Sequence, residues 1–169
     1  PVCGTDLGPT ILEACGMKPT KGMTGQSFVG EFTEKKDAVR HYVFAERGWH
    51  FGPITRTDGL DFSRSITSER YRYIYNALPD RSYTPVDMAN KDAWKAIQQA
   101  YASGELSRLH QELYFIKPRP IAELYDLKND PFELKNLAGT TSTCETEDKL
   151  RESLEGWICL LYTSPSPRD

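Results

Sequence analysis

Residues 123–138, ELYDLKNDPFELKNLA, are the stretch of sequence that decides the fold. Apolar and polar side chains alternate over its first five residues, which predicts a β-strand. Residues 129–131, Asn-Asp-Pro, predict a turn after this strand, because Asn and Asp bond to nearby backbone and Pro fixes φ. Phe132, Leu134 and Leu137 give the next segment an apolar side, which predicts one helical turn clamped onto a small sheet. We assign this whole stretch a structural role.

Further strands are predicted upstream of this stretch. Residues 63–67 and 71–76 flank a polar turn at residues 68–70, which is the pattern of an antiparallel hairpin. Three tyrosines occupy alternate positions of residues 71–76, so they share one face of the sheet. We interpret this aromatic row as sheet packing, because it lacks the basic surroundings that a base-stacking platform needs. Residues 41–46 are rich in β-branched and aromatic side chains and predict another strand.

Three helices are predicted after the hairpin in the sequence. Residues 92–103 place apolar side chains at helical spacing and end before Gly104, and a second short helix follows with leucines at positions 106, 109 and 113. The last predicted helix, residues 145–157, has acidic residues in its first turn, as the helix dipole favours. These helices provide apolar faces that could cover a small sheet.

Another helix is predicted at residues 5–16, near the amino terminus. Thr5 or Asp6 can cap its first turn, and Gly16 suits the left-handed residue after its last turn. Its apolar face consists of Leu7, Ile11 and Leu12, with Ala14 or Cys15. We interpret Asp6 and Thr10 as residues that cap and pack this helix. The stretch that follows, up to residue 32, is rich in glycine and predicts a loop.

Composition excludes several classes of protein. The chain has 169 residues, of which 38% are apolar and 27% are charged, as in ordinary soluble globular proteins. No run of apolar residues is long enough to predict a membrane span, and the formal charge of -3 argues against a general nucleic-acid binder. The four cysteines lack zinc-like spacing, and their number leaves the redox compartment open.

Both ends of the chain are unusual. The sequence begins at Pro1 without an initiator Met or a signal peptide, so we expect it to begin within a longer protein. Residues 159–169, CLLYTSPSPRD, read as the in-frame translation of a sequencing-library transposase adapter. We therefore leave these residues out of the functional interpretation. The expected native part is residues 1–158.

Several ordered motifs resemble the carboxyl-terminal region of the sulfatase family, which are enzymes of alkaline-phosphatase-like fold. They are the Asp, Pro-Thr and Ala-Cys-Gly pattern of residues 6–16, Gly-Gln-Ser-Phe at 25–28, the hairpin at 63–76, Arg-Pro at 119–120 and the stretch 123–138. The resemblance implies an α+β fold, a small antiparallel sheet with packed helices. It implies that residues 1–32 are the tail end of a catalytic α/β domain and that residues 33–158 form the carboxyl-terminal sulfatase subdomain.

The resemblance also implies a chemistry. Sulfatases hydrolyse sulfate esters or sulfamates with a Cys or Ser matured to formylglycine in a CxPSR or SxPSR motif, and a bound Ca²⁺ polarises the sulfate. Neither motif occurs in this sequence, and neither Cys3 nor Cys15 is followed by Pro-Ser-Arg. We therefore assign no catalytic residue and no metal ligand to this chain. Calcium and formylglycine are expected upstream, and the fragment alone is expected to be inactive.

Candidate substrate contacts follow the predicted strand at residues 41–46. Glu46, Arg47 and His50 lie where the strand runs into a loop with glycines, and loops at strand ends often carry binding residues. In the sulfamidase-like branch, close to heparan N-sulfatase, a Glu followed by a His-bearing loop faces the substrate cleft. The resemblance therefore implies that these three residues contact substrate, and Arg64 is a weaker candidate. We interpret His41 and His110 as structural.

The expected partners are a sulfated carbohydrate, such as a glycosaminoglycan, and the protein's own catalytic domain in cis, with no nucleic acid and no membrane. Export to the periplasm, the lysosome or the outside is expected from the family. Two alternatives remain: a phosphodiesterase or phosphonate hydrolase of the same superfamily, and a noncatalytic carbohydrate-binding module. A nucleophile motif upstream of Pro1 would separate the enzymes from the module.

Overall fold

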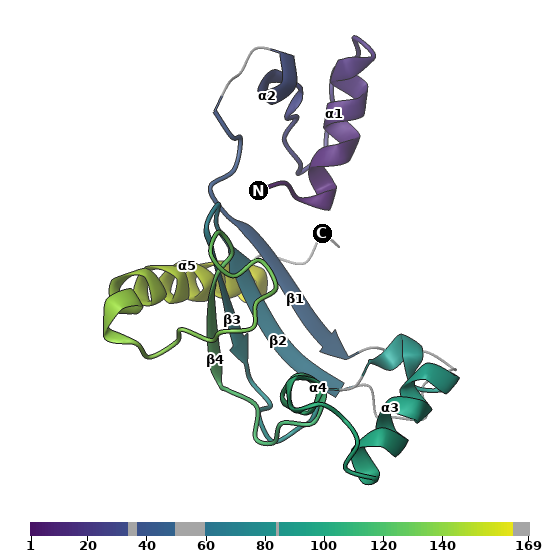
Figure 1. Ribbon diagram of the computed structural model, residues 1–169. Helices are drawn as coiled ribbons and strands as arrows, with labels where there is room; N and C mark the ends of the chain where they lie inside the picture. The colour runs from purple at the N-terminus through teal and green to yellow at the C-terminus, as the bar shows by residue number, and fades with distance from the viewer. Residues whose placement is uncertain (34–36, 50–59, 84, 164–169) are drawn as a thin grey trace.

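A four-stranded antiparallel sheet forms the centre of the computed structural model, which describes residues 1–33, 37–49, 60–83 and 85–163 (Figure 1). Its strands are β1 (Val43–Trp49), β2 (Leu60–Thr67), β3 (Tyr71–Asn76) and β4 (Ala122–Asp126). The spatial order is β1-β2-β3-β4, and each neighbouring pair is antiparallel. The predicted hairpin is β2 and β3, and the predicted α+β class with a small antiparallel sheet is confirmed.

Helix α5 (Cys144–Thr163) covers one face of this sheet and completes the core (Figure 1). Ile66, Tyr73 and Leu124 are register partners on three adjacent strands, so their side chains point to the same face. Leu150 and Leu154 of α5 pack against them, and all five side chains are buried. The tyrosine row therefore packs at Tyr73, as predicted.

The remaining helices lie at the two ends of the sheet (Figure 1). Beyond one end are α1 (Leu7–Ala14) and α2 (Val29–Thr33), and near the other end are α3 (Asp92–Ala102) and α4 (Arg108–Tyr114). Short 3-10 turns occur at Gly4–Asp6, Val86–Met88 and Thr141–Thr143. No helix within the described ranges is both long and apolar enough to cross a membrane.

Stacked aromatic rings join α3 to α4. The rings of Trp94 and Phe115 lie 5.8 Å apart, and those of Tyr101 and Phe115 lie 4.0 Å apart, both close to parallel. Trp94 also meets Tyr114 edge to face at 5.7 Å. Because aromatic pairs add to the stability that their buried area gives, these contacts hold the two short helices as one unit.

A buried carboxylate organises the amino-terminal segment. Asp6 accepts hydrogen bonds from the backbone N–H groups of Cys3 and Gln26, at 3.0 and 2.8 Å, and forms a two-point ion pair with Arg40, at 2.6 and 2.7 Å. The Thr10 hydroxyl donates to the Asp6 carbonyl and accepts from the Phe28 N–H. The predicted packing role of Asp6 and Thr10 is confirmed, although the Asp6 side chain does not cap α1.

Three predicted details are wrong. The helical turn after β4 does not form: Leu137 N–H donates to the Leu124 carbonyl, and the Asn136 side chain bonds backbone of β4, so this segment follows the strand edge instead. Phe132 and Leu134 are exposed. Strand β1 begins two residues later than predicted and includes Arg47, because pairing with β2 continues to Trp49.

Two helices also differ from prediction. The short helix α2 lies at the end of the stretch that was predicted to be a loop up to residue 32. The closing helix, predicted to end at Trp157, extends to Thr163. Residues 159–163 therefore continue the helix on which the core residues lie.

Candidate functional site

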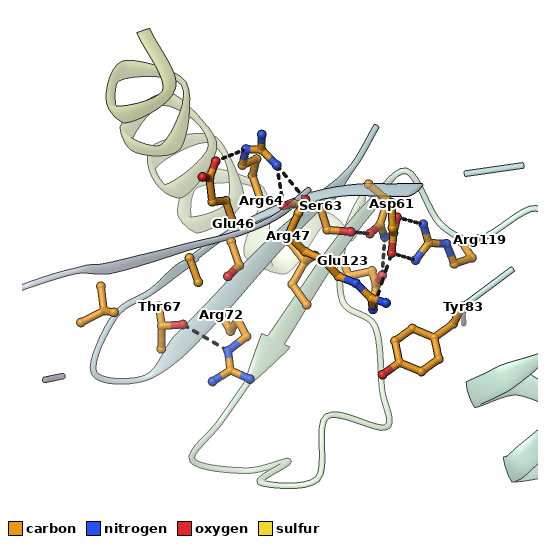
Figure 2. Close-up of a pocket in the computed structure, with 15 residues that line it drawn as sticks. Glu46, Arg47, Asp61, Ser63, Arg64, Thr67, Arg72, Tyr83, Arg119 and Glu123 are labelled. Carbon is orange, nitrogen blue, oxygen red and sulfur yellow. Dashed lines mark hydrogen bonds and ion pairs between the residues drawn. The ribbon is translucent and has the colours of Figure 1, made fainter. Parts of the chain in front are cut away.

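The sheet face opposite α5 carries an open hollow of about 530 Å³ (Figure 2). Alternation along the strands decides which side chains reach it. Arg47, Ser63 and Asn76 are register partners on β1, β2 and β3. Each is an odd number of residues away from the core residue of its strand, so its side chain points to the face opposite the core. These three polar side chains therefore lie on the face that α5 does not cover.

The predicted substrate contacts are divided between the two faces. Glu46 and Arg64 are direct register partners, and Arg64 Nε lies 3.2 Å from a Glu46 carboxylate oxygen on the α5 side of the sheet (Figure 2). Arg64 Nη1 also donates to the carbonyls of Arg47 and Ser63, at 2.9 and 3.0 Å. Arg47 is the predicted contact whose side chain belongs to the opposite face. His50 lies outside the described residues.

A buried carboxylate with two cations lies beside the hollow. Arg119 donates from both terminal nitrogens to Asp61, at 2.6 and 3.2 Å, and each of these two side chains is only 10% exposed. Arg47 makes a longer contact of 3.7 Å with the same carboxylate and is 31% exposed. The two-point pair fixes Asp61 on Arg119. Arg47 is the cation of this group that is more open to the hollow.

Tyr83 forms the rim of the hollow beside this group. The Arg47 guanidinium carbon lies 5.0 Å from the centre of the Tyr83 ring, within the range of a cation–π contact. The tyrosine ring is partly exposed, and Figure 2 shows it directed toward Arg47. An aromatic face and a cation are therefore presented together at the edge of the sheet.

A chain of hydrogen bonds crosses the floor of the hollow. Ser63 donates to the Asn76 side chain at 2.8 Å, and the Asn76 amide donates to the carboxylate of Glu123. The second Glu123 oxygen accepts from the Tyr125 hydroxyl, and burial together with this bond raises the pKa of Tyr125 well above its usual range. Tyr125 therefore stays protonated and donates this hydrogen bond.

Sequence reasoning did not find Asp61, Tyr83 or Arg119 as members of a site. Asp61 and Arg119 are 58 residues apart in the chain and meet only because β2 and the segment before β4 lie close in the folded sheet. Arg119 contributed to the resemblance only as part of the Arg-Pro motif at residues 119–120, and no role was assigned to its side chain. The only feature of the sequence that could have indicated Asp61 was its position just before a predicted strand. Many charged surface residues have such a position, so it does not identify a site.

The described residues do not fit a calcium site. Among them, no group of three or more His, Cys, Asp or Glu side chains could hold a metal ion. The buried carboxylates Asp6, Asp61 and Asp126 are each engaged by an arginine, at 2.6 to 2.7 Å. A hard cation needs several oxygen ligands, and here the acidic oxygens are occupied by guanidinium groups.

Comparison with known proteins gives a consistent result, although no family model matches the chain. An ulvan-active sulfatase of Formosa agariphila is 33% identical over 156 residues, which are 90% of this chain and 24% of that protein. A second ulvan-active sulfatase of the same organism is 29% identical over 158 residues, which are 91% of this chain and 28% of that protein. The chain thus spans about a quarter of the length of these relatives.

Solved structures agree in fold. A 2-O GAG sulfatase superposes with a TM-score of 0.55 and 20% identity, covering 91% of this chain and 24% of that one. An enzyme solved in complex with its substrate D-glucosamine-2-N,6-O-disulfate gives a TM-score of 0.53 and 16% identity, covering 97% of this chain and 25% of that one. At these identities the structures establish the fold alone.

The fold is that of the small carboxyl-terminal subdomain of alkaline-phosphatase-like enzymes, with four antiparallel strands and a helix across one face. Within that class, the sequence relationship over nine-tenths of the chain is to sulfatases. The chain belongs to the sulfatase family and corresponds to its carboxyl-terminal region.

Proposed function

We propose that this chain is part of an enzyme that hydrolyses sulfate esters or sulfamates on a sulfated carbohydrate. The observation that carries the proposal is the 33% identity to an ulvan-active sulfatase over 156 residues. The fold shared with glycosaminoglycan sulfatases agrees with it. The substrate class is taken from the names of these proteins and includes both ulvan and glycosaminoglycans.

The catalytic chemistry of the proposed enzyme belongs to residues outside this chain. The sequence has no CxPSR or SxPSR motif, so formylglycine would be formed elsewhere in the enzyme. The buried carboxylates here are paired with arginines, so the calcium ligands would also come from elsewhere. When bound, calcium would supply charge that stabilises the sulfate oxygens. This chain would supply shape and charge around the substrate.

Two surfaces support a place beside a catalytic domain. Leu7 and Ile11 on α1 are exposed, and apolar side chains gathered on one helix face are typical of a surface that packs against a neighbour. The hollow on the free sheet face provides Arg47 as a cation for an anionic substrate. His50, which lies outside the described residues, is proposed as a second contact from the resemblance alone. Export of the enzyme is proposed from its relationship to sulfatases.

The proposal is tested by sulfate release. The coding sequence upstream of residue 1 is recovered, and the extended protein and the 169-residue chain are purified and assayed with calcium on ulvan and on a sulfated glycosaminoglycan. We expect the extended protein to release sulfate and the 169-residue chain to release none. No release by the extended protein from either polysaccharide, or release by the short chain, would contradict the proposal.

The same assay tests the predicted contacts. Arg47→Gln and His50→Ala in the extended protein are expected to lower kcat/KM by about 10-fold or more, because each removes an interaction with the substrate, worth about 1.4 kcal/mol per factor of 10. Lys95→Gln is the control, since Lys95 forms an exposed i,i+3 ion pair with Asp92 on α3, away from the hollow. The control should keep the activity of the unaltered enzyme.

A further inference from the structure

We propose that the outer edge of β1 pairs, through main-chain hydrogen bonds, with an extended strand from the part of the enzyme that lies outside this chain. This edge pairing rests on the proposed function, since the added strand would belong to the same enzyme. It concerns the backbone of the sheet edge, whereas the predicted substrate contacts concern side chains. Neither the resemblance nor the comparisons assign a partner to this edge.

The hydrogen-bond pattern of the sheet fixes the direction of the main-chain groups in β1. The N–H of Ala77, directly after β3, donates to the Phe62 carbonyl of β2 at 2.8 Å. Since bonded and non-bonded pairs alternate in an antiparallel ladder, the even-numbered residues of β2 bond β3 and the odd-numbered residues bond β1. The odd-numbered residues of β1 are their register partners. The N–H and C=O groups of Phe44 and Glu46 therefore point away from the sheet.

These outward groups form an open edge. Within the part of the chain that the structure describes, the main chain of Phe44 and Glu46 has no hydrogen-bond partner, because β1 is the first strand in the order β1-β2-β3-β4. Register with β2 is regular from Val43 to Arg47 and shifts only beyond that point. A regular edge with unpaired donors and acceptors is a template for another strand.

The opposite edge of the sheet, at β4, is covered by this chain itself. The outward N–H of Leu124 donates to the Asn136 side chain at 2.9 Å, and the Leu124 carbonyl accepts from the Leu137 N–H at 2.8 Å. Asn136 also donates to the Ala122 carbonyl at 3.1 Å. Because open edges invite unwanted pairing, natural sheets protect them. The chain protects β4 in this way, so the cover of β1 is the part that must come from outside.

The rest of the enzyme is the occupant that fits this position. This chain spans 24% and 28% of the two ulvan-active sulfatases, so most of a protein of their length lies outside it. Helix α1, on which Leu7 and Ile11 are exposed, lies beyond the end of the sheet at which β1 begins (Figure 1). A neighbour that packs on α1 is therefore placed near the start of this edge.

Side chains beside the edge define what the added strand would carry. A residue paired with Phe44 would share a face of the sheet with the Phe44 ring, which stacks on Trp157 with 5.0 Å between the ring centres. An apolar residue fits that position. At the next outward position, the Glu46 carboxylate lies 3.2 Å from Arg64, so a polar residue fits beside this pair. The occupant is thus an extended segment with an apolar residue two positions from a polar one.

Hydrogen exchange of the β1 amides tests the pairing. In the 169-residue chain we expect the amides of Phe44 and Glu46 to exchange rapidly and the amide of Ala45, which bonds β2, to exchange slowly. In the extended protein the amides of Phe44 and Glu46 should exchange about 100-fold more slowly than in the chain. Rapid exchange in both proteins would overturn the proposal. Slow exchange in the 169-residue chain that depends on its concentration would assign the edge to a second copy and would also overturn it.

Glu46→Pro and Glu46→Ala separate the main chain from the side chain. Both remove the carboxylate that pairs with Arg64, but only proline removes the outward N–H. The two variants of the 169-residue chain should unfold at the same temperature, because proline is tolerated on an edge strand where the N–H faces solvent. In the extended protein, Glu46→Pro should restore rapid exchange at Phe44, and Glu46→Ala should keep it slow.

Equal protection of the Phe44 amide in the two extended variants would contradict the edge pairing. Sulfate release by the unaltered extended protein is measured separately. An active enzyme with rapid exchange at Phe44 contradicts the edge pairing alone, whereas an inactive protein with a protected Phe44 amide contradicts the proposed function alone.

Discussion

Asp6 is the residue on which the amino-terminal segment depends. Its carboxylate is fully buried and joins the turn before α1, the backbone of Gln26 and the side chain of Arg40. Gly25 makes this possible, because a Cβ at that position would lie 1.9 Å from the carbonyl oxygen of Thr5. The hydrogen bonds from Arg40 hold the pKa of Asp6 well below its usual range, against the opposing effect of burial.

Asp6→Asn is expected to destabilise this segment by about 3 kcal/mol, because it leaves Arg40 without its buried partner. The exchange rate of the Gln26 amide hydrogen measures this, since that N–H donates to Asp6. Asp148→Asn is the control, because Asp148 forms an exposed i,i+3 pair with Arg151. Exchange at Gln26 that stays as slow in Asp6→Asn as in the control would contradict the account.

The same carboxylate gives a pH dependence with a defined sign. The pKa of Asp6 is lower in the folded state than the value of about 3.9 that an unfolded chain has. The pair therefore stabilises the fold above about pH 4, and this contribution is lost as the pH falls toward the folded pKa. We expect Gln26 exchange protection to fall on acidification in the unaltered chain and to depend less on pH in Asp6→Asn.

At the residue scale, sequence reasoning found part of the site. Arg47 was a candidate from the strand and loop pattern, and it does lie beside the hollow. Glu46 and Arg64 were candidates too and also line the hollow, but they pair with each other, and their strand positions alternate with that of Arg47. Asp61 and Tyr83 could not be found, because their roles depend on contacts between distant segments.

Helix α5 is the element that gives the sheet its core. Leu150 and Leu154 lie one helical turn apart and both contact the row formed by Ile66, Tyr73 and Leu124. Phe44 at the other edge of that row stacks on Trp157, with 5.0 Å between the rings. The apolar stripe of the helix therefore spans about two turns and covers the sheet from its centre to β1.

Leu154→Ala is expected to lower the free energy of unfolding by about 2–5 kcal/mol, because Leu154 is almost fully buried and its removal leaves a cavity. Chemical denaturation followed by circular dichroism measures the change. Glu152→Ala on the exposed side of the same helix should change stability by no more than about 0.5 kcal/mol. Similar losses in the two variants would contradict the assignment of the core to this face.

Sequence patterns predicted strands and helices correctly where the spacing of apolar residues and the turn or capping residues indicated the same element. Alternation in residues 63–76 gave the hairpin, and Gly104 ends α3 with the left-handed φ of 75° that glycine favours. The prediction was wrong after β4, where the spacing of apolar residues predicted a helical turn. This segment instead forms hydrogen bonds with the edge of β4. Asp126 also decides that turn, since it accepts from Lys128 N–H and the Asn129 side chain, at 3.2 and 2.8 Å.

At the scale of the whole molecule, the two faces of the sheet have different tasks. One face is apolar and is closed by α5, which makes the unit stable. The other is polar and carries the hollow with Arg47, Asp61 and Arg119. Sequence resemblance predicted the family and the α+β class from ordered motifs. The resemblance could not predict which residues lie on which face of the sheet, because this depends on how the strands pair in the folded protein.

The sequence of the DNA on both sides of this reading frame, determined with a different library chemistry, tests the central claim most directly. If the chain is the carboxyl-terminal region of a sulfatase, the frame upstream of residue 1 continues into a calcium-binding Asp-Asn and a CxPSR or SxPSR motif. We also expect residues 159–169 to be replaced by another sequence. A start codon directly before Pro1, with residues 159–169 unchanged, would contradict the account and indicate a noncatalytic module.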